Sequence, residues 1–370
     1  MIPQPVRRSL GRLLLVFASF CCGIVLVEFG WSLLPPLTLA ETDRTRRYML
    51  FGGGAGSAFE NVGRFFLYRP ASVIRAAAYF DTAVGLVQEY EYEFHTNNLG
   101  LVQKDNVVAG TPSVLILGDS FTEGQGAEPW FERVAPFFVA RNHQPINGGL
   151  LGTGFSQWIL LHEHLRARNI VIKKLIVVLI SDDYERPIWN FPTQVLNCLS
   201  SYLNCMGDEE FYGMPPDSLR HAFLEKLKYY QESKAARPRL LPATTLAYGE
   251  VRHLSAKARQ WLNLRVRQPQ EPVAAADDPS GARHVRFFAD LYGKDVVFVH
   301  LPVLTELPDG PEEPGIAARA AIRGSGAQFF DGFSRCGLTV SDYYAYDGHP
   351  NAAGYAKIAD CVREAAKEIM

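Results

Sequence analysis

From residue 113 onward, short apolar runs alternate with longer segments whose apolar residues recur at helical spacing. The runs at 114–117, 175–180 and 296–301 have the length of buried strands, while 157–168 and 352–369 have the pattern of helices. Strands that are apolar on both faces and alternate with helices are typical of a mostly parallel sheet covered on both sides. We therefore predict an α/β fold for this part of the chain.

Shorter elements fit between these five. We expect strands at 145–147 and 328–330, and helices at 129–141 and 284–292. The alternation of strand and helix thus continues to the end of the chain, with one interruption.

The interruption lies at about 186–283. This segment contains two cysteines, a proline-rich stretch at 236–239 and a polar stretch at 268–272, and it has helical patterns at 226–234 and 254–264. We interpret it as a helical insertion near the carboxyl end of the third strand, the edge where open α/β sheets bind ligands. It either shapes the ligand site or only decorates the surface.

The region before the α/β pattern is different in character. Glycines at 52–54 and 56 indicate a break, and the aromatic-rich stretches at 65–68 and 89–94 predict strands. We assign 35–109 to a linker and an N-terminal extension, packed on a main domain at 110–370.

The N-terminus carries a long apolar segment. Residues 13–27 are largely apolar, and 29–34 extend the run past Glu28. The whole is about 20 residues, roughly the length that crosses a bilayer. We predict a cytoplasmic tail at 1–11 and an uncleaved transmembrane signal anchor at 12–34. The alternative is a signal peptide cleaved after Ala40.

The cysteines indicate on which side of the membrane the rest of the chain lies. Two of the six cysteines fall in the predicted span, which leaves four disulfide candidates: Cys198, Cys205, Cys336 and Cys361. Two disulfides would require an oxidising compartment, whereas four reduced, buried cysteines would not. We expect a single-pass protein of the cytoplasmic membrane, with its body on the extracytoplasmic (periplasmic) side.

Charge and motif content exclude several classes of function. The formal net charge is −2, so the chain has no basic excess suited to nucleic acid. It also lacks a phosphate-binding loop, a dinucleotide fingerprint and cysteine or histidine spacings typical of metal sites. We expect no cofactor and no metal.

The first candidate for chemistry follows the strand at 114–117. There Gly118 allows a tight turn, and Ser120 is presented at the carboxyl end of the strand. Ser120 can also open the next helix, whose N-terminal N–H groups favour a developing negative charge. Ser120 is therefore a candidate nucleophile, and the alternative is an ordinary helix N-cap.

The second candidate precedes the last predicted helix. His349 stands before Pro350, which favours an extended conformation and places it in a loop. Asp347, two residues earlier, can hold one imidazole nitrogen, so that the other nitrogen is free to accept a proton from a serine. His349 is the candidate base and Asp347 the candidate orienting acid.

Together these motifs resemble the SGNH (GDSL-type) hydrolases. The resemblance implies a three-layer α/β/α, flavodoxin-like fold, with Ser120 as nucleophile and His349 as base. The common family spacing puts the acid at Tyr346, whereas Asp347 matches the shorter spacing of the related alginate-type O-acetylation proteins. Residues 96–100 (T-N-N-L-G) resemble the lead-in of many membrane-anchored members of the family.

Two further blocks extend the resemblance. Residues 147–154 look like the second family block, which implies that the N–H groups of Gly152 and Ser120 form the oxyanion hole. Asp182 stands where the third block has an asparagine donor. Because an ionised aspartate only accepts hydrogen bonds, three outcomes are open: Asp182 is protonated in a dry site, another residue replaces it, or turnover is weak.

The resemblance implies a serine esterase that acts on ester-linked acyl groups of cell-surface glycans or lipids through a Ser-His-Asp triad. One alternative is an O-acyltransferase, or its partner, in polysaccharide O-acetylation, for which Trp158, Trp189 and Tyr184 are candidate aromatic platforms. The other is a catalytically weak carbohydrate-binding protein. The expected partners are the acylated substrate, the membrane through 12–34, and polysaccharide-modification proteins.

Overall fold

The computed structural model describes residues 46–82, 85–207, 209–235, 280–307 and 309–370, and six positions between Phe17 and Ile24. Residues 45–227 and 277–370 form one compact unit, and this unit is described below. Most of the predicted anchor at 12–34, and all of the helix predicted at 254–264, lie outside the described residues. Within the described ranges, no helix combines the length and the apolar character that crossing a membrane requires.

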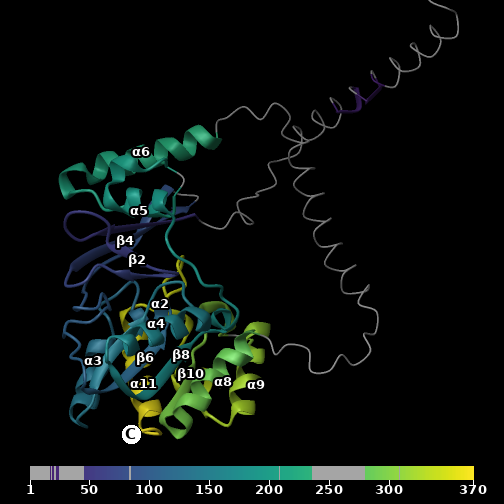
Figure 1. The fold of residues 1–370 in the computed structure, drawn as a ribbon. Helices are drawn as coiled ribbons and strands as arrows, with labels where there is room; N and C mark the ends of the chain where they lie inside the picture. Colours follow the sequence, from purple (N-terminus) through teal and green to yellow (C-terminus); the bar gives the residue numbers. More distant parts are fainter. Residues whose placement is uncertain are drawn as a thin grey trace, which may run out of the picture. The chain divides into compact units, whose positions relative to one another are not determined.

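A five-stranded parallel sheet forms the centre of this unit (Figure 1). Its order is β11 (Gln328–Asp331), β10 (Val296–His300), β8 (Val171–Leu179), β6 (Pro112–Gly118) and β7 (Gln144–Gly149). Every neighbouring pair is parallel. In chain order this is the flavodoxin-like 2-1-3-4-5 arrangement, so the predicted mostly parallel α/β sheet is confirmed.

Helices cover both faces of this sheet, because its strands bury apolar side chains on both sides. One face packs against α3 (Phe131–Val139) and α11 (Ala352–Ala366). The other packs against α4 (Phe155–Ala167), α8 (Ser280–Tyr292) and α9 (Glu313–Ser325). The three-layer α/β/α arrangement is therefore present, and α3, α4, α8 and α11 lie where the sequence predicts helices.

In the part of the chain that the structure describes, the remaining helices are shorter or lie outside these layers. The α-helices are α2 (Ser120–Glu123), α5 (Thr193–Ser200), α6 (Asp217–Ala235) and α10 (Gly332–Arg335). The 3-10 turns are η2 (Ser181–Tyr184), η3 (Tyr202–Asn204), η4 (Gly293–Asp295), η5 (Leu304–Glu306) and η6 (Val340–Asp342).

A second sheet belongs to the same compact unit. It has the order β5 (Gly85–His95), β4 (Val73–Thr82), β1 (Arg47–Gly52) and β9 (Phe211–Gly213). We call these four strands the N-terminal sheet. The hairpin of β2 (Phe59–Val62) and β3 (Phe65–Tyr68) accompanies it. The strands predicted at 65–68 and 89–94 are confirmed.

The described part of the insertion contains helices α5 and α6, as the sequence predicts, together with one short strand that the sequence does not predict. Its first part supplies β9, which pairs in parallel with β1 of the N-terminal sheet. A strand of three residues is too short to show a period in sequence, and its stability comes from pairing with β1 rather than from its own pattern. The helix predicted at 226–234 is confirmed within α6.

Four cysteines form two disulfides. Cys198 of α5 is bonded to Cys205, and Cys336 is bonded to Cys361 of α11. This agrees with the prediction of two disulfides rather than four reduced thiols.

Candidate active site

Ser120 lies at the turn between β6 and α2. Asp119 is the N-cap of α2, and its carboxylate accepts a hydrogen bond from the Phe121 N–H at 2.9 Å. A side chain at Gly118 would collide with Thr122 and with the Val178 carbonyl, so only glycine fits there. The strand, turn and helix therefore present Ser120 at the carboxyl edge of the sheet, as the sequence predicts.

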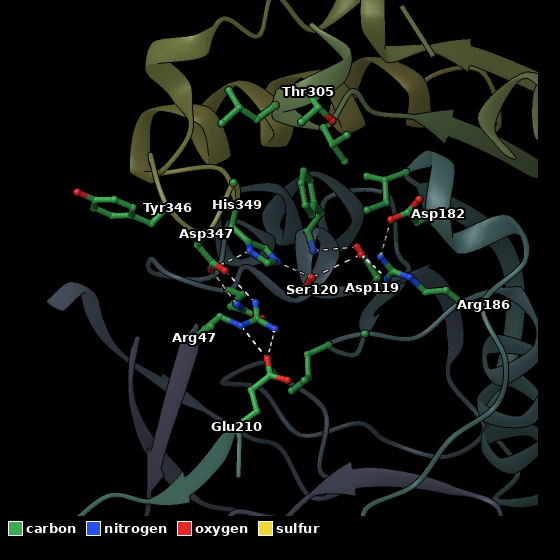
Figure 2. A pocket seen from close by; sticks show the side chains of 18 of the residues that line it. Arg47, Asp119, Ser120, Asp182, Arg186, Glu210, Thr305, Tyr346, Asp347 and His349 are labelled. Atoms are coloured by element: carbon green, nitrogen blue, oxygen red, sulfur yellow. Dashed lines mark hydrogen bonds and ion pairs between the residues drawn. The ribbon is translucent and has the colours of Figure 1, made fainter. Parts of the chain in front are cut away.

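The structure brings His349 to Ser120 from the other end of the chain. His349 Nε2 lies 2.7 Å from Ser120 Oγ, and His349 Nδ1 lies 2.8 Å from Asp347 Oδ2 (Figure 2). The His349 residue is 9% exposed and the Asp347 side chain 2%. Asp347, His349 and Ser120 thus form one continuous, buried chain of polar contacts.

The spacing of two residues between acid and base depends on Gly348. Its φ of +72° lies in the left-handed region, which glycine adopts without strain. This turn lets the side chains of Asp347 and His349 face each other. Tyr346, the position of the acid at the common family spacing, instead stacks on Phe80 with a centroid distance of 5.8 Å.

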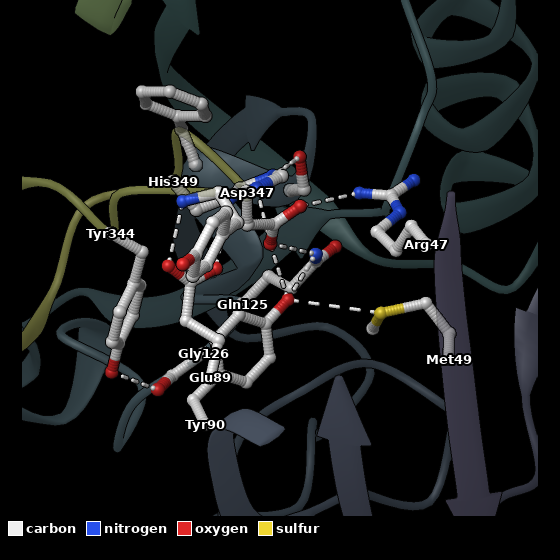
Figure 3. A network of polar contacts seen from close by, with 12 residues as sticks. Arg47, Met49, Glu89, Tyr90, Gln125, Gly126, Tyr344, Asp347 and His349 are labelled. Carbon is white, nitrogen blue, oxygen red and sulfur yellow. Dashed lines mark hydrogen bonds and ion pairs between the residues drawn. The ribbon is translucent and has the colours of Figure 1, made fainter. Parts of the chain in front are cut away.

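Three donors besides His349 hold the carboxylate of Asp347 (Figure 3). Arg47 Nη1 donates to Oδ1 at 2.8 Å, and Gln125 Nε2 donates to Oδ2 at 3.1 Å. The Tyr90 hydroxyl also donates to Oδ2. Burial by itself would raise the pKa of Asp347, but His349, Arg47 and Tyr90 together hold this pKa well below its usual range.

The N-terminal sheet also fixes the loop that carries Asp347. Glu89 of β5 accepts hydrogen bonds from the N–H groups of Tyr346 at 2.7 Å and Asp347 at 2.8 Å. Arg47 of β1 is itself held by Glu210, with Nη2 2.6 Å from Oε1. Sequence reasoning missed Arg47, Glu89 and Tyr90, although two of them lie in a segment predicted to be a strand.

Ser120 and His349 open into a cavity of about 740 Å³ that Gly152, Asp182 and Trp189 also line. Gly152 has a φ of +67°, and its carbonyl accepts a hydrogen bond from Trp189 Nε1 at 2.9 Å. The structure thus places Gly152 in the same cavity as Ser120, as the resemblance implies.

Of the three aromatic residues considered as platforms, only Trp189 lines the cavity. Trp158 is fully buried and Tyr184 is 3% exposed. Both pack within the core, so they are not surface platforms for a glycan.

Asp182 does not occupy a dry site. Its side chain is 69% exposed, so the dry environment considered for it from the sequence is absent. The neighbouring residue, Asp183, is buried instead. Its carboxylate accepts a hydrogen bond from the Ile180 N–H at 2.9 Å. Burial and the nearby Asp119 raise the pKa of Asp183 well above its usual value, while Arg186 opposes this rise.

Arg186 is a further polar residue of the cavity that the sequence did not single out. Burial by itself would lower the pKa of its guanidinium, but the carboxylates of Asp183 and Asp119 raise it above its usual value. The guanidinium therefore carries its charge at any working pH.

Glu123 lies behind the loop that carries Gly152. Its Oε2 accepts a hydrogen bond from the Leu151 N–H at 2.8 Å, and its Oε1 accepts one from the Tyr68 hydroxyl at 2.7 Å. Burial raises the pKa of Glu123 to about 8. Within the described ranges, no group of three or more histidine, cysteine, aspartate or glutamate side chains is arranged to hold a metal ion.

We compared the chain with known proteins by sequence and by structure. No family model matches the chain, and no curated protein matches it in sequence. Similar solved structures include an α/β hydrolase from the Lake Arreo metagenome, with 12% identity over 71% of this chain and 98% of that one, at a TM-score of 0.34.

Two others are named as esterases or lipolytic proteins. A member of the lipolytic G-D-S-L family from Veillonella parvula is 11% identical over 68% of this chain and 97% of that one, at a TM-score of 0.32. A variant of an acetyl xylan esterase from Geobacillus stearothermophilus is 13% identical over 71% and 96%, also at 0.32.

Proposed function

We propose that this protein is a serine esterase in which Ser120 is the nucleophile, His349 the general base and Asp347 the orienting acid. The observation that carries the proposal is the contact chain from Asp347 Oδ2 to His349 at 2.8 Å and from His349 to Ser120 Oγ at 2.7 Å. A hydroxyl is a weak nucleophile until an adjacent base accepts its proton, and this geometry supplies that base.

The reaction follows from the contacts. Ser120 Oγ bonds to the ester carbonyl carbon while its proton passes to His349 Nε2, and the carbonyl oxygen becomes an oxyanion facing the Ser120 and Gly152 N–H groups. The tetrahedral intermediate collapses, and His349 gives its proton to the departing alcohol. Water then attacks the acyl-serine with His349 again as base, which releases the acid and restores Ser120.

The cavity supports an acyl group attached to a larger molecule. Its volume of about 740 Å³ lies within the range of ligand sites. Its walls include Trp189 and Tyr346, which offer apolar ring surface beside polar groups. We propose ester-linked acyl groups on glycans or lipids of the cell surface as the substrate class.

We also propose that the catalytic unit lies outside the cytoplasm, tethered through residues 12–34. The two disulfides support this placement because such bonds persist in oxidising compartments. Alkylation of intact cells with a membrane-impermeant thiol reagent, after mild reduction, should label Cys205, which is partly exposed, whereas its partner Cys198 is buried. Labelling only after cell lysis would contradict this placement.

The test of the function is covalent labelling with a fluorophosphonate. We would use the full chain, made in an oxidising compartment and purified in detergent, and locate the adduct by mass spectrometry. The expected result is one adduct on Ser120 that is lost in His349→Ala and kept in the matched control His95→Ala, since His95 is exposed and does not line the cavity.

The absence of an adduct in folded protein would contradict catalysis and favour a glycan-binding role. Given an adduct, the fate of the acyl group separates the two enzymatic alternatives. Release of free acid in the presence of excess glycan acceptor supports the esterase, whereas quantitative transfer to the glycan would make the protein an O-acyltransferase.

A further inference from the structure

Arg186 joins the two segments that carry the oxyanion N–H groups. Its Nη1 donates to Asp119 Oδ2 at 3.0 Å, next to Ser120, and to the Thr153 carbonyl at 3.3 Å, next to Gly152. The stem of Arg186 packs on the same loop, where a side chain at Gly154 would come within 2.7 Å of Arg186 Cβ. Arg186 therefore adds to the contacts that hold these two segments together, among them the hydrogen bond from the Leu151 N–H to Glu123.

Several carboxylates lie near Ser120, and a cation is needed to offset their negative charge. Asp119 Oδ2 lies 3.4 Å from Ser120 Oγ and is 1% exposed, so its field is poorly screened by solvent. The family resemblance puts Asp182 where an asparagine donor would stand, and a carboxylate there supplies no hydrogen-bond donor. Arg186 Nη1 is 2.8 Å from Asp183 and 3.0 Å from Asp119, so a single guanidinium offsets the carboxylates beside the nucleophile.

The second terminal nitrogen of Arg186 remains available to a ligand in the cavity. Nη2 is 3.9 Å from Asp182 Oδ2, which is longer than a hydrogen bond, so this pair does not occupy its N–H groups. The Arg186 side chain is 24% exposed and lines the cavity. Figure 2 shows it on the opposite side of Ser120 from His349.

We propose that Arg186 replaces the missing side-chain donor: its Nη2 donates to the oxyanion on the substrate, and its Nη1 holds the Ser120 and Gly152 segments in place. Asp182 then takes no part in binding the reacting acyl group. This inference rests on the proposed ester chemistry. In that chemistry the carbonyl oxygen of the ester gains its negative charge when the bond between Ser120 Oγ and the carbonyl carbon forms. It loses this charge when the leaving alcohol departs.

The test compares Arg186→Gln, Arg186→Lys and Asp182→Asn with the matched control Arg133→Gln, a change at an exposed arginine of α3. For each full-length variant we would measure kcat and KM for a soluble acetyl ester, and the affinity for a boronic acid that forms a tetrahedral anion on the serine. We expect Arg186→Gln to lower kcat by about 10²–10³, the effect of losing one oxyanion donor. The boronate affinity should fall in parallel, while KM changes by no more than a few-fold.

Asp182→Asn separates the two candidate donors. We expect it to keep or raise kcat, since it removes a negative charge and the proposal gives Asp182 no catalytic contact. Loss of kcat in Asp182→Asn with full activity in Arg186→Gln would overturn the inference. A wild-type chain that neither turns over esters nor takes up a fluorophosphonate would instead overturn the proposed function.

Arg186→Lys covers the case in which the glutamine variant does not fold, because removal of Arg186 leaves two buried carboxylates without their cation. Lysine keeps one positive charge near Asp119 and Asp183 but lacks the planar fork that reaches both Asp119 and the oxyanion. We expect it to unfold at a temperature close to that of the wild type and to have a kcat at least tenfold lower. A folded Arg186→Lys variant with wild-type kcat and boronate affinity would contradict a donor role for Nη2.

Discussion

Glu123 offers a test of the structure that needs no substrate. Its carboxyl is 2% exposed and lies between the Tyr68 hydroxyl and the Leu151 N–H. Burial raises its pKa from 4.5 to about 8. Glu123→Gln keeps the shape of the side chain and can still accept a hydrogen bond from Leu151, but it cannot ionise. The variant therefore removes the titration of this one group.

The sign of the effect follows from proton binding. Because the pKa is higher in the folded than in the unfolded protein, the folded state binds the proton more tightly. The stability from this group is complete below about pH 4.5 and is lost as the pH rises to about 8. The difference of about 3.5 pKa units corresponds to about 5 kcal/mol, most of it lost between pH 5 and pH 9.

The assay is urea unfolding of both proteins at several pH values from 5 to 9. The free energy of unfolding of Glu123→Gln should rise relative to that of the wild type by about 4 kcal/mol over this range. Glu128→Gln, at an exposed position, should follow the wild type at every pH. A difference between Glu123→Gln and wild type that stays constant with pH would refute the buried, titrating carboxyl described above.

Three further changes test other parts of the structure. Arg47→Met removes a donor to the buried Asp347 carboxylate, and we expect kcat to fall more than tenfold, whereas an unchanged kcat would show that the remaining donors suffice. Replacing Cys336 and Cys361 together by serine opens a loop with a separation of 25 residues, which should lower the free energy of unfolding by about 3 kcal/mol in urea titrations; an unchanged value would contradict this bond. Trp189→Phe keeps an aromatic ring but loses the indole N–H that donates to the Gly152 carbonyl, so kcat should fall several-fold while the free energy of unfolding falls by only about 1 kcal/mol; a kcat equal to that of the wild type would contradict this.

The central sheet could be predicted because its local and global signals agree. The runs at 114–117, 175–180 and 296–301 are apolar on both faces, which only a sheet covered on both sides accommodates. The N-terminal sheet was harder to predict. Its strand β4 contains three successive alanines, which have low strand propensity, and it is stable because it pairs with β1 and β5.

The candidate site likewise contains residues that could be predicted from the sequence and residues that could not. Ser120, Asp347 and His349 could be predicted because each stands within two residues of a glycine or proline that fixes the local turn. Arg186 could not, because an arginine three or four residues after an aspartate, as Arg186 is after Asp183 and Asp182, reads in sequence as an ordinary local ion pair. Its role depends on Asp119, 67 positions away, and the fold alone brings the two together.

The sequence pattern places the start of the main domain at residue 110, but residues before this boundary also contribute to the proposed active site. Residues 45–109 belong to the same compact unit as the central sheet. They supply Arg47 and Tyr90 to the carboxylate of Asp347, and Glu89 to the backbone beside it. A chain that began at residue 110 would keep Ser120, His349 and Asp347 yet leave the acid with fewer donors and a looser loop. Since a base positioned 1 Å away from its nucleophile loses much of its effect, the N-terminal sheet is as much a part of the proposed active site as the motifs that first indicated it.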